Sequence, residues 1–185
     1  MVLDHREVVA LLESLRTWRD RAIAGLMVFC GLRSGEVLSL DVADVDIGAR
    51  WLRVSGKGGV ERRVPLDVDV AGVVQTYLLA ERPETASTGL FIVAKGPTRG
   101  QRLTAAGLRR IFRYHRDLTG ITAARPHVLR HTFGSALAEA GVDLAVMQAL
   151  LGHAHIDTTA RYVHLAPAHV KAEFDAARAR QRADT

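Results

Sequence analysis

The stretch RAIAGLMVFCGLRSGEVLSL, residues 21–40, organises the fold because its first half is apolar on nearly every side. A helix that is apolar all round lies inside a protein rather than on its surface. We therefore predict a buried central helix that Gly31 ends, since glycine readily takes the left-handed conformation that closes helices. Ser34 is predicted to cap the short helix GEVLSL that follows.

The segments that flank this helix predict further helices and one small sheet. Asp4 and Glu7 have the spacing of a capping box, and apolar residues from Val8 to Leu15 recur at the helical period. WLRVS (51–55) and ERRVPL (61–66) have the composition of two strands around the glycine-rich turn GKGG. The sheet is therefore predicted to be antiparallel.

Helical patterns dominate the rest of the chain. A helix is predicted from Val70 until Pro83 stops it, followed by a short extended piece and a loop over residues 90–103. Later helices are predicted to begin at Thr104, Pro126, Asp143, Asp157 and Pro167. The polar tail ARARQRADT, residues 177–185, is expected to fray. The fold class is thus α+β, mainly α, in one domain over residues 1–185.

Composition limits the function classes. The 185 residues are 48% hydrophobic and 24% charged, as in globular proteins, and the net charge of +5 favours an anionic partner, with nucleic acid as the first candidate. The single cysteine, Cys30, lies in an apolar run, so it is expected to be buried and cannot form an internal disulfide. We find no signal peptide and no run long enough to cross a bilayer, so a cytoplasmic location without a membrane partner is expected.

Two familiar kinds of site are disfavoured. GKGG lacks the spacing and the following Ser or Thr of a phosphate-binding P-loop. His127 and His131 stand four residues apart, as zinc ligands can, but Arg130 lies between them and no glutamate follows His127. A fixed cation beside a dication is unfavourable, so zinc is not expected.

Two arginines stand out as candidates for binding an anion. Arg33 follows the central helix at a corner between helices, and Arg130 is placed to share a helix face with His127. Buried arginines need a counter-anion, which can be a carboxylate such as Glu36 or a phosphate, whose oxygens fit the guanidinium fork. Both possibilities stay open at this point.

Four segments, in this order, resemble the catalytic domain of the tyrosine recombinase (phage integrase) family. They are GLRSGEVLSL, a lysine between two strands, PHVLRHTFGSALAEAG and LLGHAHIDTTARYVH. Lys57 follows Arg33 by 24 residues and Tyr162 follows His153 by 9, spacings typical of bacterial members. The resemblance covers nearly the whole chain. It implies a site-specific DNA recombinase or integrase that cleaves and rejoins strands through a 3′-phosphotyrosyl intermediate.

The resemblance also implies that six side chains act on one DNA phosphate. In chain order they are an arginine that clamps non-bridging oxygens, a lysine that protonates the leaving 5′ oxygen, a histidine that takes or returns the tyrosine proton, a second clamping arginine, a histidine that bonds the same phosphate, and the attacking tyrosine. In this chain they are Arg33, Lys57, His127, Arg130, His153 and Tyr162. Glu36 would support Arg33. Neither a metal, ATP nor another cofactor is implied.

Structural roles remain as alternatives for several of these residues. The two histidines can be satisfied core residues, and Tyr162 can pack its ring with the hydroxyl bonded to a carbonyl. Lys57 can be the exposed tip of a hairpin, with Lys95 as the rival general acid. The basic helix LRRIFRYHR can contact the DNA backbone or be a merely solubilising face. Its arginines are Arg109, Arg110, Arg113 and Arg116.

The expected partner is double-stranded DNA, with a homo-oligomer (a tetramer) on DNA and a monomer when free. Val170 and Phe174 form a small apolar stripe after Pro167, which we expect to dock on a neighbouring protomer, or else on the core of its own chain. The family's N-terminal DNA-clamping domain is expected to be absent from residues 1–185. The alternatives in function are a catalytically silent DNA-binding accessory protein and a topoisomerase-like DNA-relaxing enzyme.

Overall fold

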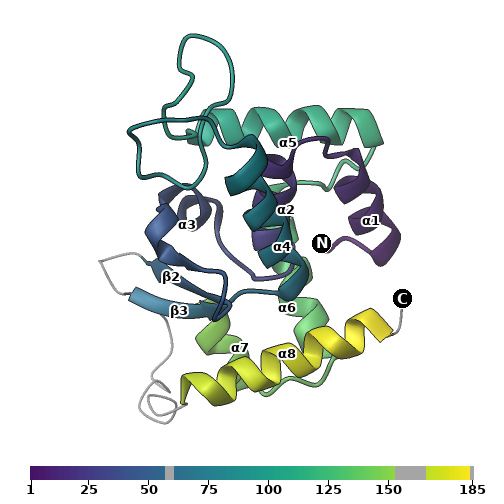
Figure 1. The fold of residues 1–185 in the computed structure, drawn as a ribbon. Coiled ribbons are helices and arrows are strands. Elements are labelled where there is room, and N and C mark those ends of the chain that lie inside the picture. The colour runs from purple at the N-terminus through teal and green to yellow at the C-terminus, as the bar shows by residue number, and fades with distance from the viewer. Residues whose placement is uncertain (57–60, 153–165, 184–185) are drawn as a thin grey trace.

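Helix α2 (Trp18–Val28) runs through the middle of the protein, as its apolar sequence predicts (Figure 1). The computed structural model describes residues 1–56, 61–152 and 166–183. Residues from Ala22 to Val28 are all buried, and the helix packs against α4 and α6. The helix ends at Val28, and Gly31 takes a left-handed φ of 72° in the connection that follows.

Seven more α-helices are described, and several begin at the predicted caps. The side chains of Asp4, Thr104 and Asp143 each accept a hydrogen bond from the first turn of their helix, and Asp4 and Glu7 form the predicted capping box. The helices are α1 (His5–Ser14), α3 (Ser34–Ser39), α4 (Val68–Thr76), α5 (Ala105–Thr119), α6 (Pro126–Glu139), α7 (Leu144–Leu151) and α8 (Pro167–Ala183). Helix α4 continues as a π-helical turn, η3 (Tyr77–Glu81), which ends just before Pro83.

The prediction that Ser34 caps α3 is wrong. Ser34 is the first residue of the helix, and Arg33 is the N-cap with an extended backbone. The backbone N–H of Arg33 donates to Glu36 Oε2 at 2.8 Å, so the carboxylate of Glu36 closes this helix end. Glu36 is therefore fixed beside Arg33 by the start of the helix itself.

The two predicted strands pair in an antiparallel sheet. Strands β2 (Trp51–Ser55) and β3 (Glu61–Pro65) pair with Leu52 opposite Val64, and a two-residue strand, β1 (Val45–Asp46), lies on the other side of β2. Leu52, Val54 and Val64 are fully buried. Strand β1 was not predicted because two residues are too few to show an alternating pattern.

The apolar core has two parts. The larger cluster joins α1 to α5, the sheet and the start of α6. The smaller cluster joins the end of α6 with α7 and α8, which lie together at the end of the molecule away from α5 (Figure 1). Cys30 is fully buried in the larger cluster, as expected.

Helix α8 packs on the core of its own chain. Val170, Phe174 and Ala177 are buried in the smaller cluster. The prediction of a frayed tail is wrong for residues 177–183, which are helical. Arg178 Nε donates to the buried carboxylate of Asp67 at 2.8 Å, and Arg182 Nη1 donates to the same oxygen at 3.2 Å. These ion pairs join the last turns of α8 to the start of α4.

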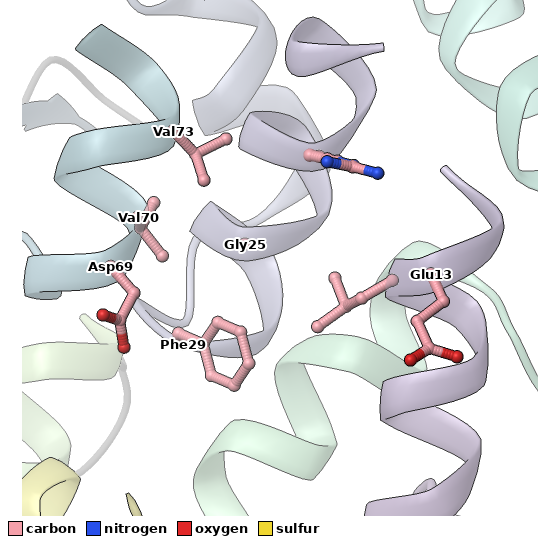
Figure 2. A pocket seen from close by; sticks show the side chains of 8 residues that line it. Glu13, Gly25, Phe29, Asp69, Val70 and Val73 are labelled. Atoms are coloured by element: carbon pink, nitrogen blue, oxygen red, sulfur yellow. The ribbon is translucent and has the colours of Figure 1, made fainter. Parts of the chain in front are cut away.

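A pocket of about 370 Å³ opens between α1, α2 and α4 (Figure 2). Its lining is mainly apolar and includes Phe29, Val70 and Val73, with Glu13 and Asp69 on opposite sides. Of the residues predicted for catalysis, the three that the structure describes, Arg33, His127 and Arg130, do not line it. No helix among the described residues is long and apolar enough to span a membrane.

Candidate active site

Glu36, on α3, is the centre of a cluster of arginines. Its side chain is only 6% exposed. Arg33 Nη1 donates to Oε1 at 2.9 Å, while Arg62 donates from Nη1 to Oε1 at 2.7 Å and from Nη2 to Oε2 at 3.1 Å. Burial would raise the pKa of Glu36, but the hydrogen bonds from Arg62 and Arg33 outweigh burial and hold that pKa below its usual value. Glu36 is therefore an anion at neutral pH.

Arg130, on α6, reaches the same place from the other side. Its Nη1 donates to the Gly31 carbonyl and lies 3.8 Å from Glu36 Oε2, and its Nη2 donates to the Leu151 carbonyl. Its side chain is 12% exposed. Burial, followed by repulsion from Arg33, lowers the pKa of Arg130 to about 10, so the guanidinium remains charged at neutral pH.

All three arginines also donate hydrogen bonds to the C-terminal end of α7. The carbonyls of its last turn have no partner within the helix and carry partial negative charge. The carbonyls of residues 150–152 accept from Arg62 Nε at 3.3 Å, from Arg130 Nη2 and from Arg33 Nη2 at 3.3 Å, respectively. Gly152 closes the helix with a left-handed φ of 58°. Side chains from α3, β3 and α6 thus meet at one helix end.

Gly31 lies in the connection between α2 and α3, beside this cluster. With its φ of 72°, a Cβ at this position would lie 2.3 Å from a ring carbon of Phe133. A glycine is therefore needed for the connection after α2 to pass close to α6. The same residue offers its carbonyl to Arg130, so the turn that ends the central helix also fixes the arginine.

The cluster suits an anion with several oxygens. Three arginines and one glutamate leave a net charge of +2 on these four side chains. The side chain of Arg33 is 45% exposed, so part of its guanidinium faces solvent. Guanidinium groups bind phosphate oxygens through paired hydrogen bonds. Because the cluster is held by carbonyls and Glu36, its donors need little rearrangement to stabilise charge on a bound group.

The structure brings together two of the six residues predicted for catalysis, Arg33 and Arg130. His127 is exposed on α6, with its ring 6.4 Å from that of His131, so it is not a core histidine. Lys57, His153 and Tyr162 lie outside the described residues, as does the predicted helix cap Asp157. The alternative general acid, Lys95, is exposed in the loop of residues 93–101. The catalytic roles remain predictions.

Helix α5 carries a basic face whose arginines are mostly exposed. Three of its arginines are exposed, and the part of the chain that the structure describes offers them no ion pair; they are Arg109, Arg110 and Arg113. Arg116 is half-buried and lies 3.6 Å from Asp117. These exposed guanidinium groups give α5 a surface of the kind that contacts polyanions.

Arg62 is the member of the cluster that the sequence analysis missed. It pairs with Val54 across the sheet, on the same side of β3 as the buried Val64. Strict alternation along ERRVPL would have placed Arg62 on that inward side. An inward arginine requires a buried carboxylate, and this was the available signal.

The chain matches the family model described as "Phage integrase family" over residues 1–169. It is 36% identical over 165 residues to tyrosine recombinase XerC of Pelobacter propionicus, covering 89% of this chain and 53% of that protein. It is 35% identical over 180 residues to tyrosine recombinase XerD of Staphylococcus epidermidis, covering 92% of this chain and 60% of that protein. The chain thus spans a little over half the length of these relatives.

Solved structures show the same fold. The crystal structure of XerA recombinase has a TM-score of 0.76 and 29% identity, over 94% of this chain and 64% of that one. A pre-cleavage complex of XerH site-specific recombinase with its difH substrate has a TM-score of 0.70 and 26% identity, over 92% of this chain and 52% of that one. The mainly helical fold with a small antiparallel sheet is therefore confirmed. With the family model covering residues 1–169, this chain belongs to the phage integrase family.

Proposed function

We propose that residues 1–185 form the catalytic domain of a site-specific DNA recombinase, which cleaves and rejoins strands through a 3′-phosphotyrosyl bond. The observation that carries this proposal is the meeting of Arg33 and Arg130 at Glu36 and the end of α7. Two fixed guanidinium groups at one point can stabilise negative charge on a phosphodiester, as metal ions do in many other enzymes. The relatives named as tyrosine recombinases support the same reaction.

The proposed reaction exchanges one phosphate ester for another. The hydroxyl oxygen of Tyr162 attacks phosphorus and gives its proton to His127, while the bond from phosphorus to the 5′ oxygen breaks and Lys57 protonates that oxygen. Arg33 and Arg130, with His153, stabilise the negative charge that gathers on the non-bridging oxygens. Rejoining is the reverse reaction with a 5′ hydroxyl as nucleophile. Because an ester bond is kept throughout, the exchange needs no ATP, and the cationic side chains take the place of a metal ion.

The environments of the other two tyrosines support Tyr162 as the nucleophile. Tyr77 is buried, and its hydroxyl accepts a hydrogen bond from the backbone N–H of Ile92 at 3.2 Å. Tyr114 is exposed on α5, where its ring packs edge-on against His115. Neither contacts the arginine cluster among the contacts of the described residues.

We further propose that the substrate is double-stranded DNA, held partly by the basic face of α5. Phosphate neutralisation by arginines supplies much of the affinity of such contacts. The chain is proposed to be a monomer when free and a tetramer on DNA, where two duplexes exchange strands. The XerH structure, which is bound to its difH substrate, supports DNA as the ligand.

The test uses a pool of randomised duplexes that carry a central nick, because cleavage near a nick releases a short fragment and traps the covalent product. The protein and pool are incubated with and without EDTA, denatured, and separated by electrophoresis, and the DNA in any covalent band is sequenced. We expect a band with the wild type and none with Tyr162→Phe.

Three other outcomes would contradict the proposal. DNA binding without any covalent band would indicate an accessory protein. Relaxation of supercoiled plasmid without strand exchange between duplexes would indicate a topoisomerase-like enzyme. A band that EDTA abolishes would indicate a metal-dependent reaction.

A further inference from the structure

Glu36 is shared by three arginines, and its charge can weaken the two that the proposed function needs. A carboxylate beside Arg33 and Arg130 competes with a phosphate for their donors. Yet Arg130 Nη1 stays 3.8 Å from Glu36 Oε2, beyond hydrogen-bond distance. The two groups form an ion pair without a hydrogen bond: Arg130 donates instead to the carbonyls of Gly31 and Leu151, and the position of Glu36 depends on its own partners.

Arg62 already binds the carboxylate of Glu36 on the side that faces Arg130. It donates to both oxygens, at 2.7 and 3.1 Å, whereas the side chain of Arg33 uses only Oε1. Oxygen Oε2, which faces Arg130, is thus already bonded to Arg62 and to the backbone N–H of Arg33. A paired, two-pronged contact of this kind is the strongest that a carboxylate makes with a side chain.

Arg62 is itself held firmly in place. Its side chain is 16% exposed, and its Nε donates to the Leu150 carbonyl at 3.3 Å. Its backbone is fixed by the pairing of β3 with β2, where it lies opposite Val54. A Cβ at Gly152 would lie 2.9 Å from Arg62 Nε, so the end of α7 is shaped around this side chain. Arg62 therefore connects the sheet, α3 and α7.

We propose that Arg62 is a positioning residue that holds Glu36 away from Arg130, so that Arg33 and Arg130 keep a net positive charge for a phosphate group. This inference rests on the proposed function, because it assigns that phosphate to the DNA backbone. With Arg62, the four side chains carry a net charge of +2. Without it, they carry +1, and Glu36 is free to move onto Arg130.

The charge count makes opposite predictions for a single and a double variant. Arg62→Met removes the cation and leaves Glu36 to neutralise its neighbours. Glu36→Gln with Arg62→Met removes one charge of each sign, which restores the net charge of +2 from Arg33 and Arg130. The diagnostic is the recovery of phosphate affinity and not of stability, because a buried ion pair that is replaced on both sides can also regain stability. Arg62→Lys keeps the charge but loses the paired contact, so it should rescue in part.

The first experiment needs neither DNA nor Tyr162. Inorganic phosphate is titrated into each variant, and the NMR signals of arginine Nε–H groups report half-saturation. Arg62→Met should weaken phosphate binding by about tenfold, as expected when one charge is removed a few ångströms away in a partly buried site. The double variant should bind within about threefold of the wild type, given that its net charge is unchanged.

Arg53→Met is the matched control, because Arg53 lies on the neighbouring strand and also pairs with a carboxylate, that of Asp44. It should bind phosphate like the wild type. The proposal is overturned if Arg62→Met binds as well as the wild type, if the double variant binds no better than Arg62→Met, or if the wild type shows no phosphate-dependent shift. Should Arg62→Met fail to fold, Arg62→Lys and the double variant still decide the question.

The second experiment measures the rate of covalent complex formation on a selected DNA site, with a normal or a methylphosphonate group at the cleavage position. A methylphosphonate has a methyl group in place of one non-bridging oxygen and carries no negative charge. Its cleavage rate therefore depends less on the positive charge of the site. The defect of Arg62→Met should therefore shrink on methylphosphonate DNA, and an equal defect on both substrates contradicts the inference. If the wild type forms no complex at all, the proposed function fails, whereas the phosphate titration still judges Arg62.

Discussion

Replacing Phe174 by alanine tests whether α8 belongs to the core of its own chain. Phe174 is 0% exposed, and its ring lies 6.4 Å from that of Phe133, within the cluster that joins α6, α7 and α8. A buried aromatic side chain covers about 150–250 Å², which at about 25 cal/mol per Å² corresponds to roughly 4–6 kcal/mol. Partial relaxation of the cavity places the expected loss in free energy of unfolding at about 3–5 kcal/mol.

Urea unfolding followed by tryptophan fluorescence is a suitable assay. Lys171 Nζ of α8 lies 5.6 Å from the centre of the Trp51 ring, so Trp51 reports on the docking of this helix. Phe174→Leu should lose less than Phe174→Ala, because it keeps most of the apolar volume. Leu79→Ala, at a site 81% exposed, should change stability by no more than about 0.5 kcal/mol.

A loss below about 1 kcal/mol for Phe174→Ala would refute packing within the chain, given the range expected for buried aromatic residues. The apolar stripe of α8 would then be available to a neighbouring protomer, as the sequence first suggested. With the packing that the structure shows, deleting the chain from Val170 onward should destabilise the monomer itself.

Three other properties can be tested with simple variants. Because the pKa of Glu36 is lowered in the folded state, its charge should stabilise the protein fully above the unfolded pKa of about 4.3, and this stability is lost as pH falls through the folded pKa. In Glu36→Gln the free energy of unfolding should therefore depend less on pH between neutral and acid pH. An unchanged dependence would argue against the charged cluster. Lys57→Ala should slow DNA cleavage on the order of a hundredfold, and its cleavage rate should recover on a 5′-bridging phosphorothioate, whose sulfur leaves without a proton. The rate of Arg33→Ala should not recover on that substrate. If Lys57→Ala is equally slow on both substrates, Lys95 or His127 becomes the next candidate for the general acid. The affinity of this chain for DNA should be weak and fall steeply with salt, and nanomolar affinity that salt leaves unchanged would contradict this account. Alanines at the exposed arginines of α5, which are Arg109, Arg110 and Arg113, should reduce the slope of log K against log salt by about one for each DNA phosphate that is no longer neutralised. An unchanged slope would show that this face is merely solubilising.

Features with local causes could be predicted from the sequence. The all-apolar pattern predicted α2, strand-like composition on both sides of a glycine-rich turn predicted β2 and β3, and cap residues such as Asp4 and Thr104 marked the starts of helices. Each depends on residues within a few positions of one another. The same is true of Glu36, whose distance of three residues from Arg33 allowed the pair that the structure shows.

Features with distant partners could not be predicted. The tail of α8 has the composition of a solvated end, but Arg178 pairs with Asp67, which is 111 residues away in the chain. Arg62 is separated from Glu36 by 26 residues, and nothing near either one in sequence indicates the other. The meeting of three arginines at the last carbonyls of α7 likewise depends on how α3, β3 and α6 pack.

The most direct measurement of the central claim is the identity of the residue that becomes linked to DNA. Covalent complexes are digested with nuclease and then with trypsin, which should release Tyr162 in the peptide YVHLAPAHVK, residues 162–171, between the cleavage points after Arg161 and Lys171. We predict that mass spectrometry finds a nucleotide phosphate on the tyrosine of this peptide. A nucleotide on a peptide containing Tyr114 or Tyr77, or on any residue other than Tyr162, would contradict the account.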